Sequence, residues 1–174
     1  MASCSEIVVD PPARLSCGAQ TFRCVLGRGG VSKTKHEGDG ATPIGRFQLR
    51  RVFFRADKVS APKTALPLSA IDKAAGWCDD PEHQDYNQLV TLPHPASCET
   101  LWRDDDVYDI IAVVGYNDDP VEPGKGSAIF MHIAKEGYVP TEGCVALEID
   151  DLRSVLAACD PETWLRINPE TPET

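Results

Sequence analysis

The pattern of apolar and polar positions predicts a chain built mainly of short β-strands. The strongest run lies at 108–116, where Ile110, Ile111, Val113 and Val114 make the segment almost continuously apolar. Such a run is typical of a strand that is covered on both faces. We therefore place the centre of the sheet at 108–116.

Shorter apolar or alternating runs predict further strands at 6–10, 21–26, 46–54, 128–133 and 164–167. Residues 117–127 form a loop rich in proline and glycine that leads from the central strand to the run at 128–133. A loop of this length suits two neighbouring strands, so we expect 128–133 to be the antiparallel neighbour of the central strand.

Residues 55–97 predict a long excursion over the sheet, because they contain five prolines and no helical stripe longer than 68–75. Long loops without regular structure are commonly functional. Four side chains of this segment are therefore expected to border a substrate groove, with simple loop packing as the alternative: Trp77, Tyr86, Asn87 and His94.

One amphipathic helix is predicted near the carboxyl end. Asp150 is a natural N-cap, and apolar residues follow at helical spacing from Leu152 to Cys159, before Pro161. We interpret the whole chain, 1–174, as a single domain with a frayed tail at 168–174.

The composition excludes some classes of function. Hydrophobic residues make up 42% of the chain, and no apolar run approaches the length of a membrane span. The formal net charge of −10 argues against binding to nucleic acid or anionic membranes. The oligomeric state is left open.

The compartment is not decided by these features. Residues 1–10 lack the basic start and apolar core of a secretory signal, and the seven cysteines are irregularly spaced, as in a protein of a reduced compartment. These features therefore do not exclude a cytoplasmic location.

Candidate chemistry lies in the segment 128–147, which carries one histidine and one cysteine. Alternation along the run places Ala128, Phe130 and His132 on one face, with His132 at the point where the strand meets a loop. That loop is rich in glycine and proline, so the chain can reverse and bring Cys144 beside His132.

A thiol beside an imidazole is a nucleophile beside its base. Gly143, which has no Cβ, permits a sharp turn that would leave the amides around Cys144 open to a substrate oxyanion. The alternative is that Cys144 is a buried apolar residue and His132 a core histidine.

A metal site is a weaker hypothesis. Zinc takes nitrogen and sulfur ligands, and four candidate ligands occur in the excursion: Cys78, His83, His94 and Cys98. Their spacing matches no known finger or ribbon, and the acidic run 104–106 has no flanking ligand pattern. No metal and no organic cofactor is therefore expected.

Three segments resemble motifs of one family. His132 followed by Thr141–Cys144 (Thr-Glu-Gly-Cys) resembles a strand histidine that precedes a Ser/Thr-x-Gly-Cys turn, and 38–47 resembles a Thr-Pro-x-Gly-x-Phe motif. Residues 102–109 resemble a Trp-Arg-Asp-Asp-x-x-Tyr-Asp stretch with one extra Asp. Together these resemble the L,D-transpeptidase catalytic domain (YkuD) family, in a compact branch, over about 25–167.

The resemblance implies a mainly β, L,D-transpeptidase-like sandwich acting on peptidoglycan stem peptides in the cell envelope. Cys144 would cleave the diaminopimelate–D-alanine bond of a tetrapeptide stem, with His132 moving the proton and the Gly143 and Cys144 amides holding the oxyanion. An amine acceptor would give a cross-link, and water would give L,D-carboxypeptidase activity. Substrate contacts are expected from six residues: Thr141, Glu142, Tyr116, Asn117, His94 and Tyr86.

The sequence departs from the family pattern in three places. The interval from His132 to Cys144 is short at twelve positions, Ala146 replaces the usual Arg or Asn, and Glu142 replaces a neutral or basic residue. A carboxylate near a thiolate disfavours the charged sulfur, so Glu142 either points away or holds the amine of an acceptor peptide. A non-catalytic binding module and a cysteine hydrolase of another peptide are the alternative functions.

Overall fold

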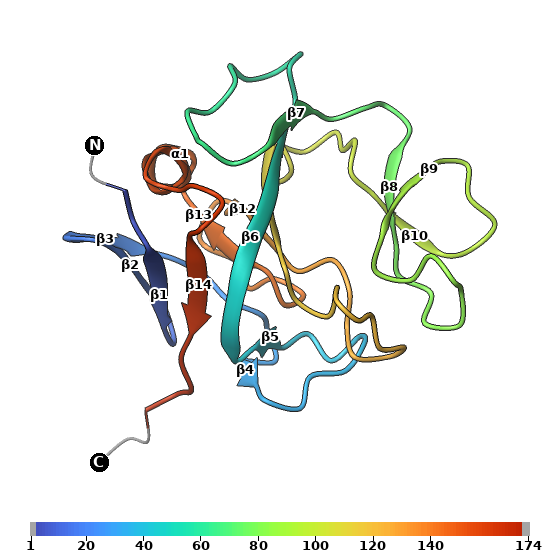
Figure 1. Ribbon diagram of the computed structural model, residues 1–174, viewed down its shortest axis with the longest axis horizontal. Helices are drawn as coiled ribbons and strands as arrows, with labels where there is room; N and C mark the ends of the chain where they lie inside the picture. The colour runs from blue at the N-terminus through green and yellow to red at the C-terminus, as the bar shows by residue number, and fades with distance from the viewer. Residues whose placement is uncertain (1–2, 172–174) are drawn as a thin grey trace.

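The strand β6 (Gly45–Phe54) joins the two halves of the molecule (Figure 1). Its first residues pair with β14 and its later residues with β11 and β7, so one strand of ten residues belongs to both halves of a nine-stranded sheet. The computed structural model describes residues 3–171.

Within residues 3–171 there are fourteen strands and one helix. Besides β6, they are β1 (Glu6–Asp10), β2 (Arg14–Cys17), β3 (Gln20–Arg23), β4 (Val31–Ser32), β5 (Thr42–Pro43), β7 (Leu68–Ala70), β8 (Ala75–Cys78), β9 (Leu89–Thr91), β10 (Cys98–Thr100), β11 (Ile110–Val114), β12 (Phe130–Ile133), β13 (Val145–Leu147), α1 (Ile149–Ala157) and β14 (Trp164–Ile167). The mainly β class expected from the sequence is confirmed.

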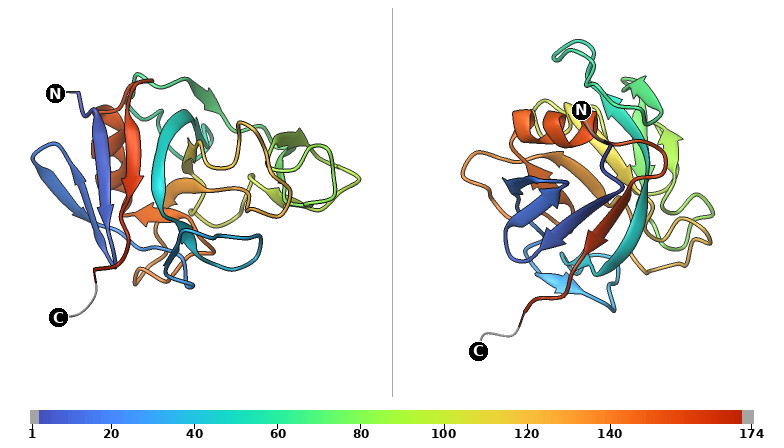
Figure 2. Two further views of the ribbon diagram at one scale, coloured as in Figure 1. Left: turned by 60° about the horizontal axis from the view of Figure 1, so that its bottom comes forward. Right: turned by 60° about the vertical axis from the view of Figure 1, so that its left-hand side comes forward.

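The large sheet has the order β13-β12-β11-β6-β14-β1-β2-β3, with β7 added beside β6. It curls so far that its ends meet: Val25, just after β3, exchanges two backbone hydrogen bonds of 2.9 Å with Ala146 in β13. Figure 2 shows this curl from two sides. The closure brings the start of the chain beside the strand that follows Cys144.

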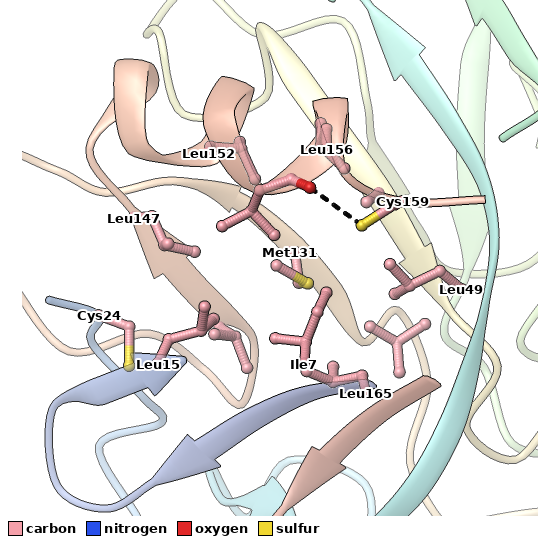
Figure 3. Close-up of a cluster of buried hydrophobic side chains, with 14 of the residues drawn as sticks. Ile7, Leu15, Cys24, Leu49, Met131, Leu147, Leu152, Leu156, Cys159 and Leu165 are labelled. Atoms are coloured by element: carbon pink, nitrogen blue, oxygen red, sulfur yellow. Dashed lines mark hydrogen bonds between the residues drawn. The ribbon is translucent and has the colours of Figure 1, made fainter. Parts of the chain in front are cut away.

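The main core fills the inside of the curl. Leucine and isoleucine side chains from the N-terminal strands and β14 face those of β12, β13 and α1 (Figure 3). The largest fully buried members include Ile7, Leu15, Met131, Leu147, Leu152, Leu156 and Leu165. Each such side chain contributes about 1.5–3 kcal/mol of burial free energy, so this core holds β12 and β13 firmly in register.

The predicted central strand is confirmed. All five residues of β11 are buried, and β11 pairs antiparallel with β12, as the single loop between them indicated. The alternation along β12 is also confirmed, because Ile129, Met131 and Ile133 enter the main core while Phe130 enters a second cluster on the opposite face.

The helix prediction was right in its apolar face and wrong in its cap. Leu152, Val155 and Leu156 are buried against the sheet, but the N-cap is Glu148, whose carboxylate accepts the Asp150 N–H at 2.8 Å. Glutamate is an unusual cap by propensity, which explains why Asp150 was the better sequence candidate.

The amino-terminal prediction of two strands was incomplete. The structure has three, because β2 lies between the predicted runs and pairs with both β1 and β3. The β14 prediction is confirmed. Part of the predicted frayed tail, 172–174, lies outside the described residues.

The excursion at 55–97 contains more regular structure than the sequence indicated. β7 pairs with β6, and β8, β9 and β10 form a separate sheet of order β10-β8-β9 (Figure 1, far from α1). These strands have only three or four residues each, so their periodicity is too short to recognise. The sheet covers the outer face of β11 and β12 through Trp77 and so completes the second cluster.

Candidate active site

A single cavity brings Cys144 and His132 together. It has a volume of about 490 Å³ and lies where the second apolar cluster meets the loop 134–143. Its wall is formed by Glu37, Gly38, Asp79, Glu99, Arg103, Val107, Tyr108, Ser127, Ala128, His132, Lys135, Val139, Pro140, Thr141, Glu142 and Cys144. A volume of this size is typical of a small-ligand or peptide site.

His132 is fixed as a neutral base by its position near the end of β12. Its Nδ1 lies 2.9 Å from the carbonyl oxygen of Ile133, and a carbonyl can only accept, so Nδ1 carries the proton. The Nε2 atom is then the basic nitrogen, and it has no hydrogen-bond partner among residues 3–171. The ring is 6% exposed, and burial lowers the pKa of His132 to about 4.

Cys144 reaches the same face of the sheet through the pairing of β13. β13 runs parallel to β12 with Ala146 opposite His132, so Cys144 lies two residues earlier on the same side. Its thiol donates to the carbonyl oxygen of Ala128 at 3.3 Å and accepts the N–H of Phe130 at 3.4 Å.

The cysteine and histidine are both neutral in this arrangement. Burial, together with the nearby Glu99 carboxylate, raises the pKa of Cys144 to about 12. Within the described chain the thiol has Ala128 as its acceptor rather than His132. The site therefore holds a thiol and an imidazole whose Nε2 has no hydrogen-bond partner in the described chain.

The turn at 141–144 is held by one hydroxyl group. Thr141 Oγ1 accepts the N–H of Gly143 at 3.1 Å and donates to the carbonyl oxygen of Cys144 at 2.7 Å. The Thr141 hydroxyl was predicted to contact substrate and the Gly143 amide to hold an oxyanion. In the structure both groups already have partners inside the turn. The N–H of Cys144, by contrast, has no acceptor within residues 3–171.

Gly143 is required by space and by backbone conformation. Its φ is +131°, and a Cβ at this position would lie 2.7 Å from the carbonyl oxygen of Ala41. Only glycine combines this φ with so close an approach. The turn therefore packs directly against the segment that contains the second sequence motif, 38–47.

Glu142 extends away from the sulfur. Its carboxylate pairs with Arg28 at 2.9 Å, and its side chain is 76% exposed. This pairing accounts for a glutamate two residues before a nucleophile, because Arg28 balances the charge and water screens it. Glu142 still forms part of the cavity rim.

Three predicted groove residues of the excursion, Trp77, Tyr86 and Asn87, lie behind the cavity wall and not in it. The Tyr86 hydroxyl is bonded to Glu37, a residue of the wall, and accepts the N–H of Gly126 at 2.9 Å. Asn87 accepts hydrogen bonds from the Trp77 indole at 2.9 Å and from the Ala128 N–H at 3.0 Å. These residues support the wall from the second layer.

The other predicted contacts lie elsewhere. Tyr116 and Asn117 border a separate hollow, in which the Asn117 side chain is bonded to the backbone of Glu122 and Gly126. His94 lies beside Asp85 and Cys98 in the excursion. The structure thus does not bring these three predicted contacts to the cavity of Cys144. Tyr116 and Asn117 follow the loop 117–127 toward β6, where Asp118 pairs with Arg50, and His94 stays beside the small sheet.

The cavity does not coincide with a group of metal-type ligands. Among residues 3–171, two sets of three ligand atoms lie close enough to share an ion, and both are outside the cavity: Cys78, His94 and Cys98, and His83, Asp85 and His94.

Comparison with known proteins identifies the family. The model of the L,D-transpeptidase catalytic domain (YkuD) matches residues 5–167. The chain belongs to this family. The resemblance to this family that the sequence indicated is therefore confirmed. No curated protein matches the sequence.

Two solved L,D-transpeptidases are similar to this family member. They are L,D-transpeptidase 1 of Mycobacterium tuberculosis, with a TM-score of 0.45 and 11% identity, and an L,D-transpeptidase of Mycobacterium smegmatis, with a TM-score of 0.46 and 13% identity. In both cases 94% of this chain is covered and 58% of the other. The chain thus spans less than two thirds of the length of these two proteins.

Sequence reasoning missed three side chains of this L,D-transpeptidase-type cavity. The Tyr108 ring packs edge-on against His132 with centroids 5.3 Å apart, its hydroxyl is bonded to Glu99, and the Arg103 guanidinium lies over it at 5.1 Å. Burial raises the pKa of both Tyr108 and Glu99. Arg103 and Tyr108 lie in the stretch 102–109, where the sequence shows a family motif and an acidic run, whereas no sequence signal marks Glu99.

Proposed function

We propose that the protein is a cysteine L,D-transpeptidase acting on peptidoglycan stem peptides. Cys144 would cleave the bond between diaminopimelate and the terminal D-alanine of a tetrapeptide stem and pass the acyl group to an amine or to water. The observation that carries the proposal is that Cys144 and His132 border one cavity of about 490 Å³ and that the His132 Nε2 is free to act as a base.

In the first half-reaction the sulfur of Cys144 attacks the scissile carbonyl carbon while His132 Nε2 takes the thiol proton. Both groups are neutral at rest, so transfer during attack avoids forming a buried thiolate beforehand. The tetrahedral oxyanion would be held by the free N–H of Cys144, since that of Gly143 is bonded to Thr141. The protonated imidazole then gives its proton to the D-alanine amine as the C–N bond breaks.

In the second half-reaction an amine or a water molecule attacks the thioester. His132 Nε2 removes a proton from the attacking group and returns it to the Cys144 sulfur as the C–S bond breaks. An amine acceptor gives a cross-linked product and water gives a trimmed stem. The thiol and the neutral imidazole are both restored.

The charges around the cavity fit a zwitterionic stem peptide. Glu37, Asp79 and Glu99 supply acidic groups, and Lys135 is an exposed cation at the rim. We choose Asp79 as the residue that holds an ammonium group, because it lines the cavity and its carboxylate has an oxygen without a hydrogen-bond partner in the described chain. We therefore place the amine of the acceptor peptide beside Asp79 instead of Glu142.

The site of action that we propose is the cell envelope, where the family's substrate lies. Among residues 3–171, the single helix is too short to cross a membrane. A net charge of −10 still argues against nucleic acid as a partner.

The second candidate function is a peptidoglycan-binding module without turnover. The observation in its favour is that the Cys144 thiol is bonded to Ala128 and that its pKa is raised to about 12. Such a protein would bind stem peptides in the same cavity and leave them unchanged. A cysteine hydrolase of another peptide would share the catalytic pair and differ in substrate.

The experiment that separates these functions is mass spectrometry of purified tetrapeptide-stem muropeptides. The wild-type protein is expected to remove D-alanine, with or without dimer formation, while Cys144→Ala and His132→Ala leave the stems unchanged. Stems that stay intact with reduced wild-type protein, yet bind to it, would favour the binding module. Turnover that persists in Cys144→Ala would contradict the cysteine mechanism.

A further inference from the structure

Two cysteines face each other on the small sheet of the excursion. Cys78 in β8 is directly opposite Cys98 in the antiparallel strand β10. The adjacent hydrogen bond from the Asp79 N–H to the Ser97 carbonyl, 3.1 Å long, shows that the two cysteines form a pair without mutual backbone bonds. In such pairs the side chains approach most closely.

His94 brings a nitrogen to the same two sulfurs. Its Nδ1 lies 3.4 Å from the Cys98 Sγ, and the ligand atoms of Cys78, His94 and Cys98 all lie within 4.8 Å of one another. Tetrahedral zinc, with bonds of about 2.3 Å to sulfur and about 2.0 Å to nitrogen, separates its sulfur and nitrogen ligands by about 3.5 Å. The three atoms are therefore close to the positions that one zinc ion requires.

The other nitrogen of His94 is oriented by a carboxylate. Its Nε2 lies 3.1 Å from Asp85 Oδ2, so the Nε2–H donates to Asp85 and the lone pair stays on Nδ1, toward Cys98. Histidines that bind metals are usually oriented in this way by a carboxylate. Asp85 is itself held in place, because its N–H donates to His83 Nδ1 at 3.2 Å.

The remaining contacts of these atoms are local and weak. Nδ1 of His94 also accepts the Ala96 N–H at 3.2 Å, and the Cys98 sulfur donates to the Ala96 carbonyl at 3.4 Å. Cys78 is fully buried, while Cys98 and His94 are half-buried, so an ion could reach the cluster from the solvent side.

We propose that Cys78, His94 and Cys98 bind one zinc ion, with Asp85 as the residue that positions His94 and with water as the fourth ligand. This departs from the expectation that the chain binds no metal. The ion would tie β8 to β10 and to the loop between β9 and β10. Asp79 and Glu99, the residues next to the two cysteines, belong to the wall of the Cys144 cavity, so zinc would also stabilise that wall.

Cys78 and Cys98 are placed for either metal binding or a disulfide, and the surrounding residues favour the metal. A Cys78–Cys98 disulfide fits the strand pairing too, but it would leave the His94–Asp85 pair without a function. The second ligand set consists of His83, Asp85 and His94 and offers two imidazole nitrogens and one carboxylate oxygen. It shares His94 with the first set. Two thiolates and an imidazole are the stronger donor set for zinc.

The test is metal analysis and Co²⁺ titration of the full chain, purified under reducing conditions without chelator. We expect about one zinc ion per chain, removable by chelator and restored by added Zn²⁺. Added Co²⁺ should give the near-ultraviolet band of thiolate ligands and the visible bands of tetrahedral coordination. The Co²⁺ titration uses the wild-type chain, so its result does not depend on whether a substituted chain can fold.

Variants then locate the ion. Cys98→Ser and His94→Ala should each lose the zinc and the Co²⁺ spectrum, and Asp85→Asn should weaken affinity by about 10- to 100-fold. Cys144→Ala and His36→Ala are the matched controls, one cysteine and one histidine outside the cluster, and both should keep one ion.

Three results would overturn the proposal. The first is no uptake of Zn²⁺ or Co²⁺ by the reduced wild-type chain. The second is zinc that stays bound in both Cys98→Ser and His94→Ala. The third is a Cys78–Cys98 disulfide, detected by peptide mass mapping, that persists under the reducing conditions of purification. None of these results depends on the proposed transpeptidase activity.

Discussion

The thiol of Cys144 is bonded to the carbonyl oxygen of Ala128, 3.3 Å away. Ala128 has a left-handed backbone with φ of 53°, a conformation that costs free energy for a residue with a Cβ. It is held there by Asn87, whose side-chain oxygen accepts the Ala128 N–H at 3.0 Å. A residue of the excursion thus positions the acceptor to which the Cys144 thiol is bonded.

Asn87→Ala should therefore impair both stability and turnover. The Asn87 side chain accepts from Trp77 and Ala128 and donates to the carbonyl groups of Tyr116 and Asn117, and alanine would leave these buried groups unpaired. We expect a loss of about 2–4 kcal/mol in the free energy of unfolding. Below the unfolding transition kcat should fall with little change in KM, because Cys144 loses its position while the cavity wall keeps its charges.

Urea unfolding and steady-state kinetics check this prediction. Gln88→Ala is the matched control, since Gln88 is the exposed neighbour of Asn87, and a surface change of this kind should shift stability by less than about 0.5 kcal/mol. An Asn87→Ala protein with wild-type stability would show that Ala128 keeps its conformation without this support.

A second prediction concerns Gly143→Ala. The new Cβ would lie 2.7 Å from the Ala41 carbonyl oxygen and would also force an alanine to φ +131°. Gly124→Ala is the control for backbone strain alone, because Gly124 has φ +77° and open space around its Cβ position. Gly124→Ala should cost about 1 kcal/mol with activity retained, whereas Gly143→Ala should cost at least about 2 kcal/mol more and lower kcat by about 100-fold or more.

Circular dichroism melting and muropeptide turnover measure the two effects. Equal losses in the two glycine variants would mean that the turn at 141–144 can move away from Ala41 without consequence for the nucleophile.

The pairing of strands was predictable in part because its signals are local. The runs at 108–116 and 128–133 are continuous or strictly alternating, and one loop rich in proline and glycine joins them, so both strands, their pairing and the face that carries His132 could be predicted from the sequence. The three reversal signals of the intervening loop permit Cys144 to lie near His132, but they do not decide between a catalytic pair and two core residues. That β13 is parallel to β12 does not follow, because the loop 134–144 makes a crossover that only the closure through Val25 explains.

The cavity wall was less predictable because its residues come from distant segments. Glu37, Asp79, Glu99 and Tyr108 meet only after the small sheet of the excursion has packed on Phe130 through Trp77. The strands of that sheet are too short to show periodicity, and the facing of Cys78 and Cys98 depends on a register that no spacing rule contains. The course of the loop 117–127 also depends on packing between distant segments, so the position of Tyr116 could not be inferred from the sequence.

A third prediction follows from the burial of His132. Its pKa is about 4 in the folded protein and about 6.5 in an unfolded chain, so between these pH values the unfolded state binds more protons. Stability is therefore lost as the pH falls from about 6.5 to about 4, by about 3 kcal/mol in total. His132→Gln should lack this part of the pH dependence, and His36→Gln, whose ring is 73% exposed, should keep it.

The same pKa sets the acid limb of the activity. The base form of His132 persists down to about pH 4, so kcat/KM for D-alanine release should fall only below that pH. An acid limb of the kcat/KM profile at about pH 6.5 would show that the His132 imidazole is far more accessible to water than its burial indicates. Urea unfolding at several pH values and a pH–rate profile of the wild-type chain give the two readings independently.

The last prediction concerns the choice between amine and water as acceptor. Asp79 has a buried oxygen without a partner in the described chain, whereas Glu142 is exposed and already paired with Arg28. Asp79→Asn keeps the size and removes the charge, so the ratio of cross-linked to trimmed product should fall about tenfold, as expected for one lost charge-assisted hydrogen bond. Glu142→Gln should change the ratio by less than about twofold, because an exposed ion pair contributes little.

Quantitative mass spectrometry of both products from one reaction measures this ratio directly, and total turnover serves as the internal reference. Zinc content is determined in parallel, since Asp79 follows Cys78 and a variant that had lost metal would change the wall for another reason. A larger fall with Glu142→Gln than with Asp79→Asn would return the acceptor site to the exposed rim. Equal slowing of both products in Asp79→Asn would mean that this carboxylate supports the donor stem, because only an acceptor contact acts after the acyl-enzyme has formed.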